Sequence, residues 1–220
     1  MTALSTLRFK IHGLLLTLLT KIIRPVPIAL AHLSRTPKPT PDLIENVLIN
    51  INSTTDHKIK LRIYNPFSTT NYCRYTATET GHTVIDVAYR LAPEHSFPAA
   101  LEDIAAVVSH VRSQPDRYDS IRISIGGFSA GGNLATSVAV NYFPPGTFKN
   151  FITFYPVLDT SIPAPTKIAN MPAEASGRPK YGGMGSVPAL AMRFFQACYV
   201  SSPKVELAEK GLSFRPVMRI

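Results

Sequence analysis

The residues with the clearest chemical meaning surround Ser129. Residues 127–131 read Gly, Phe, Ser, Ala, Gly, a GxSxG pattern that follows a β-branched stretch at 121–125 and precedes a helical pattern at 131–140. A serine at the apex of a tight strand-to-helix turn projects its hydroxyl away from the sheet, and the flanking glycines, Gly127 and Gly131, remove side chains that would collide with neighbouring elements. The pattern therefore predicts a nucleophile elbow, with Ser129 as the attacking group, over an ordinary glycine turn.

A serine that attacks a carbonyl also needs hydrogen-bond donors for the oxyanion that forms. The helix predicted after Ser129 directs its unpaired N–H groups back at the turn. We therefore expect the backbone N–H of Ala130 to be one oxyanion donor.

Two further blocks, YRLAPE and FPAALED, precede this motif. Residues 89–103 read YRLAPEHSFPAALED, and residues 126–135 read GGFSAGGNLA. In this order and separation the chain resembles the hormone-sensitive-lipase-like esterase branch of the α/β-hydrolase superfamily (α/β hydrolase fold-3). The resemblance covers residues 71–156 well, and residues 59–66 and 155–159 also look familial. One departure is Phe128, where bacterial members usually have Asp, at a position expected to face away from the hydroxyl.

The resemblance implies an α/β fold: a mostly parallel α/β-hydrolase sheet with helices on both faces, here incomplete. It implies hydrolysis of small-molecule carboxylic esters with short or medium acyl chains, without metal or cofactor. Ser129 would attack the carbonyl, a histidine would take its proton, and an acid would orient the histidine. Arg90, Glu94 and Asp103 are expected to be structural.

Some catalytic residues and the oxyanion loop of the family are missing from this sequence. The fold places the acid and the histidine after the serine, but all six histidines precede Ser129, and Asp159 is the only later Asp. We expect neither His82 nor His95 to replace the base. The familial HGGG oxyanion loop should stand near residues 67–70, yet no glycine lies between Gly13 and Gly81, and a strand has gone with the loop.

Three hypotheses follow. The chain is a carboxylesterase-type hydrolase with impaired activity, a pseudo-enzyme that binds an acyl or ester ligand without turnover, or a truncated and internally deleted form of a complete esterase. The missing histidine and HGGG loop motivate all three.

The charge excludes other classes. The 220 residues carry a formal net charge of +9, but residues 76–160, which hold the hydrolase signature, sum to −3, with +7 before them and +5 after. The basic residues are scattered singly, so no nucleic-acid partner is expected. Cys73 and Cys198 are predicted to be reduced, partly buried thiols without metal.

The amino-terminal segment is predicted to be an amphipathic helix, with Leu14, Leu15 and Leu18 on its apolar side, followed by a proline-rich linker. This gives residues 1–41 as helix and linker and residues 42–220 as a partial hydrolase domain. Packing on the domain is favoured over contact with a membrane surface, and Lys21 and Arg24 argue against a signal peptide. The apolar run is too short to cross a bilayer, so the cytoplasm, with membrane association as the alternative, is expected.

The remaining pattern predicts strands at 46–51, 59–66, 82–89 and 151–155, and helices at 71–80, from Pro98 onward and at 187–200. The strand at 59–66 is expected at a sheet edge, because its apolar residues alternate strictly with polar ones. The helix after Pro98 should bury Leu101, Ile104, Val108 and Val111.

Overall fold

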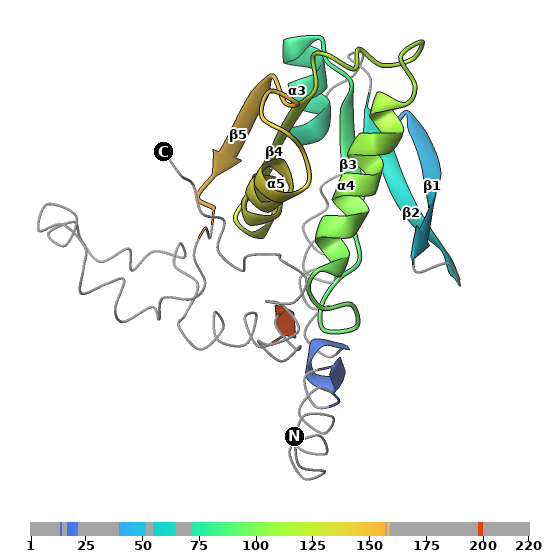
Figure 1. Cartoon of the computed structure of the whole chain (residues 1–220), viewed down its shortest axis with the longest axis vertical. Helices are drawn as coiled ribbons and strands as arrows, with labels where there is room; N and C mark the ends of the chain where they lie inside the picture. Colours follow the sequence, from blue (N-terminus) through green and yellow to red (C-terminus); the bar gives the residue numbers. More distant parts are fainter. Residues whose placement is uncertain are drawn as a thin grey trace, which may run out of the picture. The chain divides into compact units, whose positions relative to one another are not determined.

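The alternating stretch around Leu61 forms the middle strand of an antiparallel sheet. The computed structural model describes residues 14, 17–21, 40–51, 55–64, 72–156, 158 and 198–199, and its chain divides into two units, Met1–Ser120 and Ile121–Ile220 (Figure 1). The first unit holds β1 (Leu43–Ile51), β2 (Thr55–Tyr64), α3 (Tyr72–Thr80), β3 (Val84–Ala88) and α4 (Ala99–Arg112). The second holds β4 (Ser124–Phe128), α5 (Ala130–Asn141) and β5 (Asn150–Phe154).

β2 lies between β1 and β3 and is antiparallel to both. The prediction of an edge strand at this position was therefore wrong. The alternation of Ile59, Leu61 and Ile63 with polar residues arises because one face of the sheet is covered and most of the other is open, and it carries no information on neighbouring strands.

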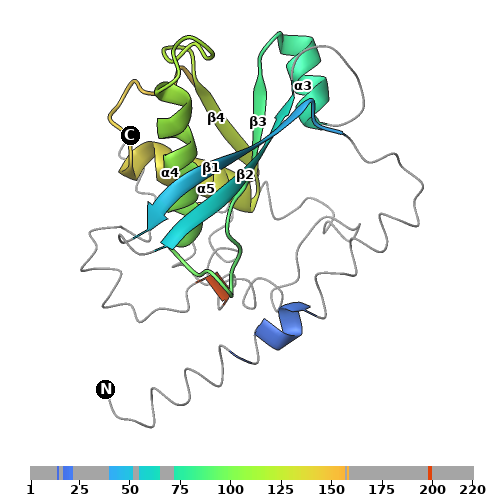
Figure 2. The ribbon, with the colours of Figure 1, turned by 90° about the vertical axis from the view of Figure 1, so that its right-hand side faces the viewer.

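The two helices of this unit lie on opposite faces of its sheet (Figure 2). α4 covers the face of Leu61, because cross-strand partners share a face and Glu45, the partner of Leu61, contacts His110 of α4. On the other face Arg74 of α3 covers the Tyr64 ring, with its guanidinium 5.4 Å from the ring centroid. Pro98 stands directly before α4, as predicted. The core between sheet and α4 contains Val47, Ile59, Leu61, Ile63, Leu101, Val107, Val108 and Val111. The predicted apolar side of α4 is confirmed except at Ile104, which is only half-buried.

The second unit is a parallel pair of strands with one helix. β4 pairs with β5 in parallel register, and α5 packs against both. β4 begins three residues later than predicted, since Ile121 is 82% exposed and the two glycines Gly126 and Gly127 extend the strand up to the turn.

The sheet differs from the predicted, mostly parallel one. Of the three strand pairings in the described residues, only β4 with β5 is parallel. The chain between β2 and β3 leaves and returns at the same end of the sheet, since Tyr64 pairs with Val84, and this makes the two strands antiparallel. Within the described residues β3 and β4 each pair on one side only and belong to separate sheets.

The amino-terminal helix is described only in part. Leu14 and residues 17–21 are helical, but Leu14 and Leu18 are 61% and 50% exposed. These two leucines therefore do not pack on the domain as the favoured prediction required. No helix in the described part of the chain is long and apolar enough to span a bilayer. The predicted helix at 187–200 lies outside the described residues apart from Cys198 and Tyr199, which are helical.

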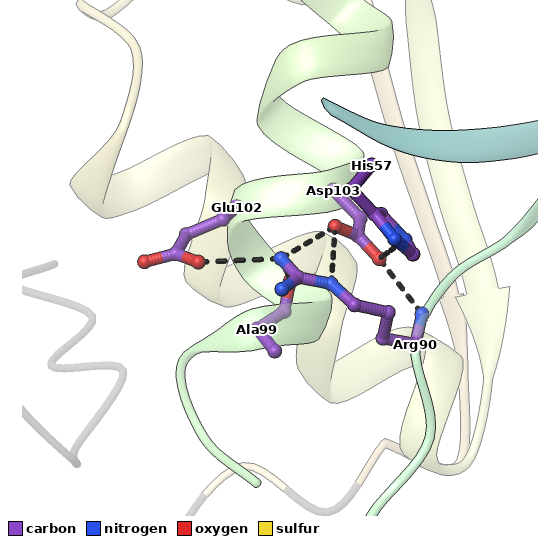
Figure 3. A network of polar contacts seen from close by, with 5 residues as sticks. All are labelled: His57, Arg90, Ala99, Glu102 and Asp103. Carbon is purple, nitrogen blue, oxygen red and sulfur yellow. Dashed lines mark hydrogen bonds and ion pairs between the residues drawn. The ribbon is translucent and has the colours of Figure 1, made fainter. Parts of the chain in front are cut away.

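A buried ion pair connects α4 to the segment after β3 (Figure 3). The Asp103 carboxylate is fully buried and accepts hydrogen bonds from the backbone N–H of Arg90 at 2.7 Å and from its Nε at 2.9 Å. The same guanidinium donates to the Ala99 carbonyl at 3.1 Å and to Glu102 at 3.3 Å. His57 of β2 has its Nε2 4.0 Å from Asp103. These contacts support the structural role predicted for Arg90 and Asp103.

We predict that Asp103→Asn lowers the free energy of unfolding by about 3–5 kcal/mol, because it leaves the largely buried Arg90 without its buried charge partner. Glu102→Gln removes a negative charge beside the same guanidinium from a side chain that is 43% exposed, so its effect should stay below about 1 kcal/mol. Urea unfolding of the two variants measures this difference. Equal, small losses would show that the Asp103 pair does not stabilise the unit.

A second polar cluster joins β1 to the carboxyl end of α4. Glu45 contacts the His110 Nε2 at 3.0 Å and accepts a hydrogen bond from Arg117 at 2.7 Å. Partial burial opposes ionisation of Glu45, but the hydrogen bonds from His110 and Arg117 and their positive charge outweigh it and hold its pKa below the ordinary value of 4.5.

This lowered pKa predicts a loss of stability in acid. A carboxylate whose pKa is lower in the folded than in the unfolded chain stabilises the fold above its unfolded pKa, and the contribution disappears as the pH falls through the folded pKa. We expect ionised Glu45 to contribute about 1 kcal/mol to the free energy of unfolding. The free energy of unfolding, measured with urea, should fall less steeply between neutral pH and pH ~3 for Glu45→Gln than for the unaltered chain. Parallel curves of this free energy against pH would contradict the assignment.

Candidate active site

Ser129 lies directly between a strand and a helix, with no intervening loop. β4 ends at Phe128 and α5 begins at Ala130. Ser129 takes φ 48° and ψ −112°, in the region with positive φ that residues with a Cβ rarely adopt. Such a conformation costs on the order of 1–3 kcal/mol and persists only where the surroundings hold it.

Two backbone hydrogen bonds hold this conformation. The N–H of Ser129 donates to the carbonyl of Phe154 in β5 at 2.9 Å, and its carbonyl accepts from the N–H of Asn133 in α5 at 3.1 Å. The serine is therefore fixed by the neighbouring strand on one side and by the first helical turn on the other. Its side chain is half-exposed.

The glycines explain how strand and helix approach so closely. A Cβ on Gly127 would lie 2.5 Å from the carbonyl carbon of Gly131 and 2.9 Å from the amide nitrogen of Gly132. A Cβ on Gly131 would meet nothing within 4 Å. The prediction that glycine prevents a collision therefore holds at Gly127. At Gly131 a Cβ would fit, and the Gly131 backbone is what a Cβ at Gly127 would strike. Gly126 also needs to be glycine, because a Cβ there would lie 2.4 Å from the Ile152 carbonyl oxygen.

Ala130 stands where an oxyanion donor is expected. As the first residue of α5 it has an N–H without a partner inside the helix, and the helix N-terminus carries a partial positive charge. Ala130 is exposed, so its surroundings are open to a ligand. This arrangement can stabilise a negative charge that develops next to Ser129.

An aromatic cluster borders the turn. The Phe128 ring stacks on Phe154 with centroids 4.8 Å apart, and the Tyr155 ring lies 5.9 Å from Phe128. All three rings are exposed, Tyr155 by 73%. Tyr155 also has a positive φ of 40°, so strained residues follow the carboxyl ends of both β4 and β5. Sequence reasoning missed Tyr155 as a site residue. Its position before Pro156, at the end of the strand predicted at 151–155, was the available signal.

The described histidines have contacts of their own within the first unit. His57 lies near Asp103, the His82 ring contacts the Thr80 carbonyl at 2.8 Å, and His110 contacts Glu45. The His95 ring centroid is 6.3 Å from that of His57. Asp159, the only Asp after Ser129, lies outside the described residues, as do the later acids Glu174, Glu206 and Glu209.

No group of three His, Cys, Asp or Glu side chains in the described part of the chain could hold a metal ion. Cys73 and Cys198 are free, as predicted, and burial together with the charge of Asp86 raises the pKa of the Cys73 thiol. Such a thiol is a poor nucleophile near neutral pH. Of the candidate nucleophiles, Ser129 is therefore the one whose backbone geometry is most specific.

Comparison with known proteins decides the family. Residues 62–205 match the family model described as alpha/beta hydrolase fold. The chain belongs to this family.

Individual relatives of this α/β hydrolase match over short stretches. Esterase LipI of Mycobacterium tuberculosis is 36% identical over 108 residues, 46% of this chain and 33% of the relative. Human arylacetamide deacetylase-like 2 is 46% identical over 69 residues, 30% of this chain and 17% of the relative. The hydrolase chain thus spans about a third or less of the curated relatives it matches.

Solved structures give the same fold over a longer stretch. An esterase of Pyrobaculum calidifontis superposes with a TM-score of 0.62 at 26% identity, covering 90% of this chain and 68% of that one. The metagenomic carboxylesterase EstE1 superposes with a TM-score of 0.57 at 24% identity, covering 80% and 65%. These neighbours support an α/β-hydrolase fold for the chain, of which the described residues form partial sheets.

The two glycines of the turn allow a matched test. Gly127→Ala should destabilise the fold by at least about 1–3 kcal/mol, because all three atoms nearest to its Cβ belong to the backbone and cannot swing away. Gly131→Ala should be neutral or stabilise by up to about 1 kcal/mol, because alanine is the better helix former and the space is open. Urea unfolding compares them, and similar midpoints would refute the close approach of β4 and α5.

Proposed function

We propose that this chain is a carboxylic ester hydrolase by descent, with Ser129 as its nucleophile and with turnover that is slow because no histidine follows the serine. The observation that carries the proposal is the strained backbone of Ser129, held between β4 and α5 by hydrogen bonds from both sides. An ordinary strand-to-helix turn gains nothing from a strained serine, whereas a nucleophile gains exposure of its hydroxyl.

The proposed chemistry is acyl transfer. The Ser129 oxygen attacks the ester carbonyl, the carbonyl oxygen becomes negative next to the Ala130 N–H, and the alcohol departs with a proton as the acyl-serine forms. Water then attacks the acyl group, which releases the carboxylic acid and restores the hydroxyl. In the proposed reaction solvent accepts and returns the proton, since none of the six histidines follows Ser129 in the sequence, where the family places its base.

Esters are the ligand class that the surroundings favour. The exposed rings of Phe128, Phe154 and Tyr155 lie on the strand ends that carry the turn and offer apolar contact to an acyl or aryl group. Neither the turn nor these rings present a charge that would select an ionic substrate. The esterase and deacetylase names of the relatives agree with this class.

A second candidate is a pseudo-hydrolase that binds an ester without cleaving it. The specific observation in its favour is the absence of glycine between Gly13 and Gly81, where the familial oxyanion loop should stand. Loss of one oxyanion donor costs on the order of 100-fold or more in turnover. Loss of the base costs more, although such losses do not add.

Labelling with a fluorophosphonate, combined with turnover of p-nitrophenyl acetate, tests the proposal. We expect slow, stoichiometric labelling and slow turnover, both abolished in Ser129→Ala. Because Ser129 is half-exposed and strained, the alanine variant should still fold, which thermal unfolding checks. Turnover that survives in Ser129→Ala would exclude this nucleophile. Ester binding in calorimetry, with neither labelling nor turnover, would replace the proposal by the pseudo-hydrolase.

A further inference from the structure

One face of the β1–β2 hairpin combines exposed aliphatic and basic side chains. Residues at alternate positions of a strand share a face, and cross-strand partners share it too. The register pairs Ile44 with Arg62, Asn46 with Lys60 and Leu48 with Lys58. This outer face therefore consists of Ile44, Asn46, Leu48, Lys58, Lys60 and Arg62.

The aliphatic side chains on the outer face are not covered by any element that the structure describes. Ile44 and Leu48 are 50% and 60% exposed, although both belong to a well-paired strand. The opposite face of the same hairpin packs under α4 and supplies the core. α3 lies against the end of β2 at Tyr64, away from Leu48 and its partner Lys58.

The basic side chains are incompletely neutralised. Arg62 pairs with Asp86 of β3 at 2.9 Å. Lys58 and Lys60 are exposed, and neither has an acidic partner within the described part of the chain. Lys58, Lys60 and Arg62 stand against two acids, Asp86 of β3 and Asp56, which the same alternation places on this face of β2, so one positive charge remains in excess. Successive cations on β2 are spaced about 7 Å apart.

We propose that this outer face binds the surface of a bilayer that contains anionic lipids. Negatively charged headgroups match Lys58 and Lys60, while Ile44 and Leu48 leave water when they enter the boundary of the acyl chains. The amino-terminal segment carries Lys10, Lys21 and Arg24, which have the same sign as Lys58 and Lys60, so its charge does not complement this face. A nucleic-acid backbone would match the charge but offers no apolar phase to the two aliphatic side chains.

Sedimentation with lipid vesicles tests the proposal on the full chain. We expect binding to vesicles of phosphatidylcholine mixed with phosphatidylserine, weak binding to phosphatidylcholine alone, and release by salt. Each basic residue near an anionic bilayer strengthens binding about fivefold, so Lys58→Gln combined with Lys60→Gln should weaken it on the order of 25-fold. Leu48→Gln should weaken it further by removing the apolar contact. All these side chains are exposed, and unchanged thermal unfolding verifies that the variants fold.

Two control variants separate this face from the rest of the chain. Lys149→Gln changes the charge of an exposed lysine outside the hairpin and should leave binding within about fivefold of the unaltered chain. Lys10→Gln combined with Lys21→Gln tests the amino-terminal segment. If that pair abolishes binding while the Lys58 and Lys60 pair leaves it unchanged, the outer face is not the lipid surface. Equal binding to both kinds of vesicle, or none, would equally overturn the proposal. Ester turnover plays no part in these readouts.

Discussion

The contact on which the proposed site depends is the approach of two backbones between β4 and α5. It leaves no room for a Cβ at Gly127, and it places the first helical turn immediately after the strand. Ser129 then has to make the connection within one residue, which gives it a positive φ. The strained serine and the helix N-terminus next to it are thus consequences of one packing constraint.

The first unit is organised by a different interaction, the buried pair of Arg90 and Asp103. Its carboxylate belongs to α4, and its guanidinium belongs to the segment that leaves β3, so the pair connects helix to sheet. Because α4 in turn covers the apolar face around Leu61, a defect in this pair would loosen the core of the unit. The familial sequence blocks therefore have two separate roles: residues 89–103 supply structural support, and residues 126–135 form the turn on which the proposed chemistry depends.

Sequence reasoning predicted most elements because their signals are local. The GxSxG turn and the helical periodicity of α4 depend on residues close together in the sequence. The strand-to-helix turn and the apolar side of α4 were both predicted correctly, apart from Ile104. The errors concern non-local facts. The strict alternation around Leu61 indicates an open face of the sheet and not an edge strand. The antiparallel pairing of β2 with β3 depends on where the chain returns to the sheet. The strained backbone of Tyr155 has only a weak local signature in the sequence. Whether Ser129 meets a base is also a non-local question, which composition and spacing cannot answer.

The central claim is that the turn presents Ser129 as a nucleophile although no histidine follows it. Peptide mass spectrometry after exposure of the folded chain to p-nitrophenyl acetate tests this directly, with the urea-unfolded chain as control. Without a base to activate water, the acyl-serine should persist, so the account predicts an acetyl group on Ser129 in the folded chain and none there in the unfolded one. Acetylation confined to lysines, with Ser129 unmodified in both states, would contradict it.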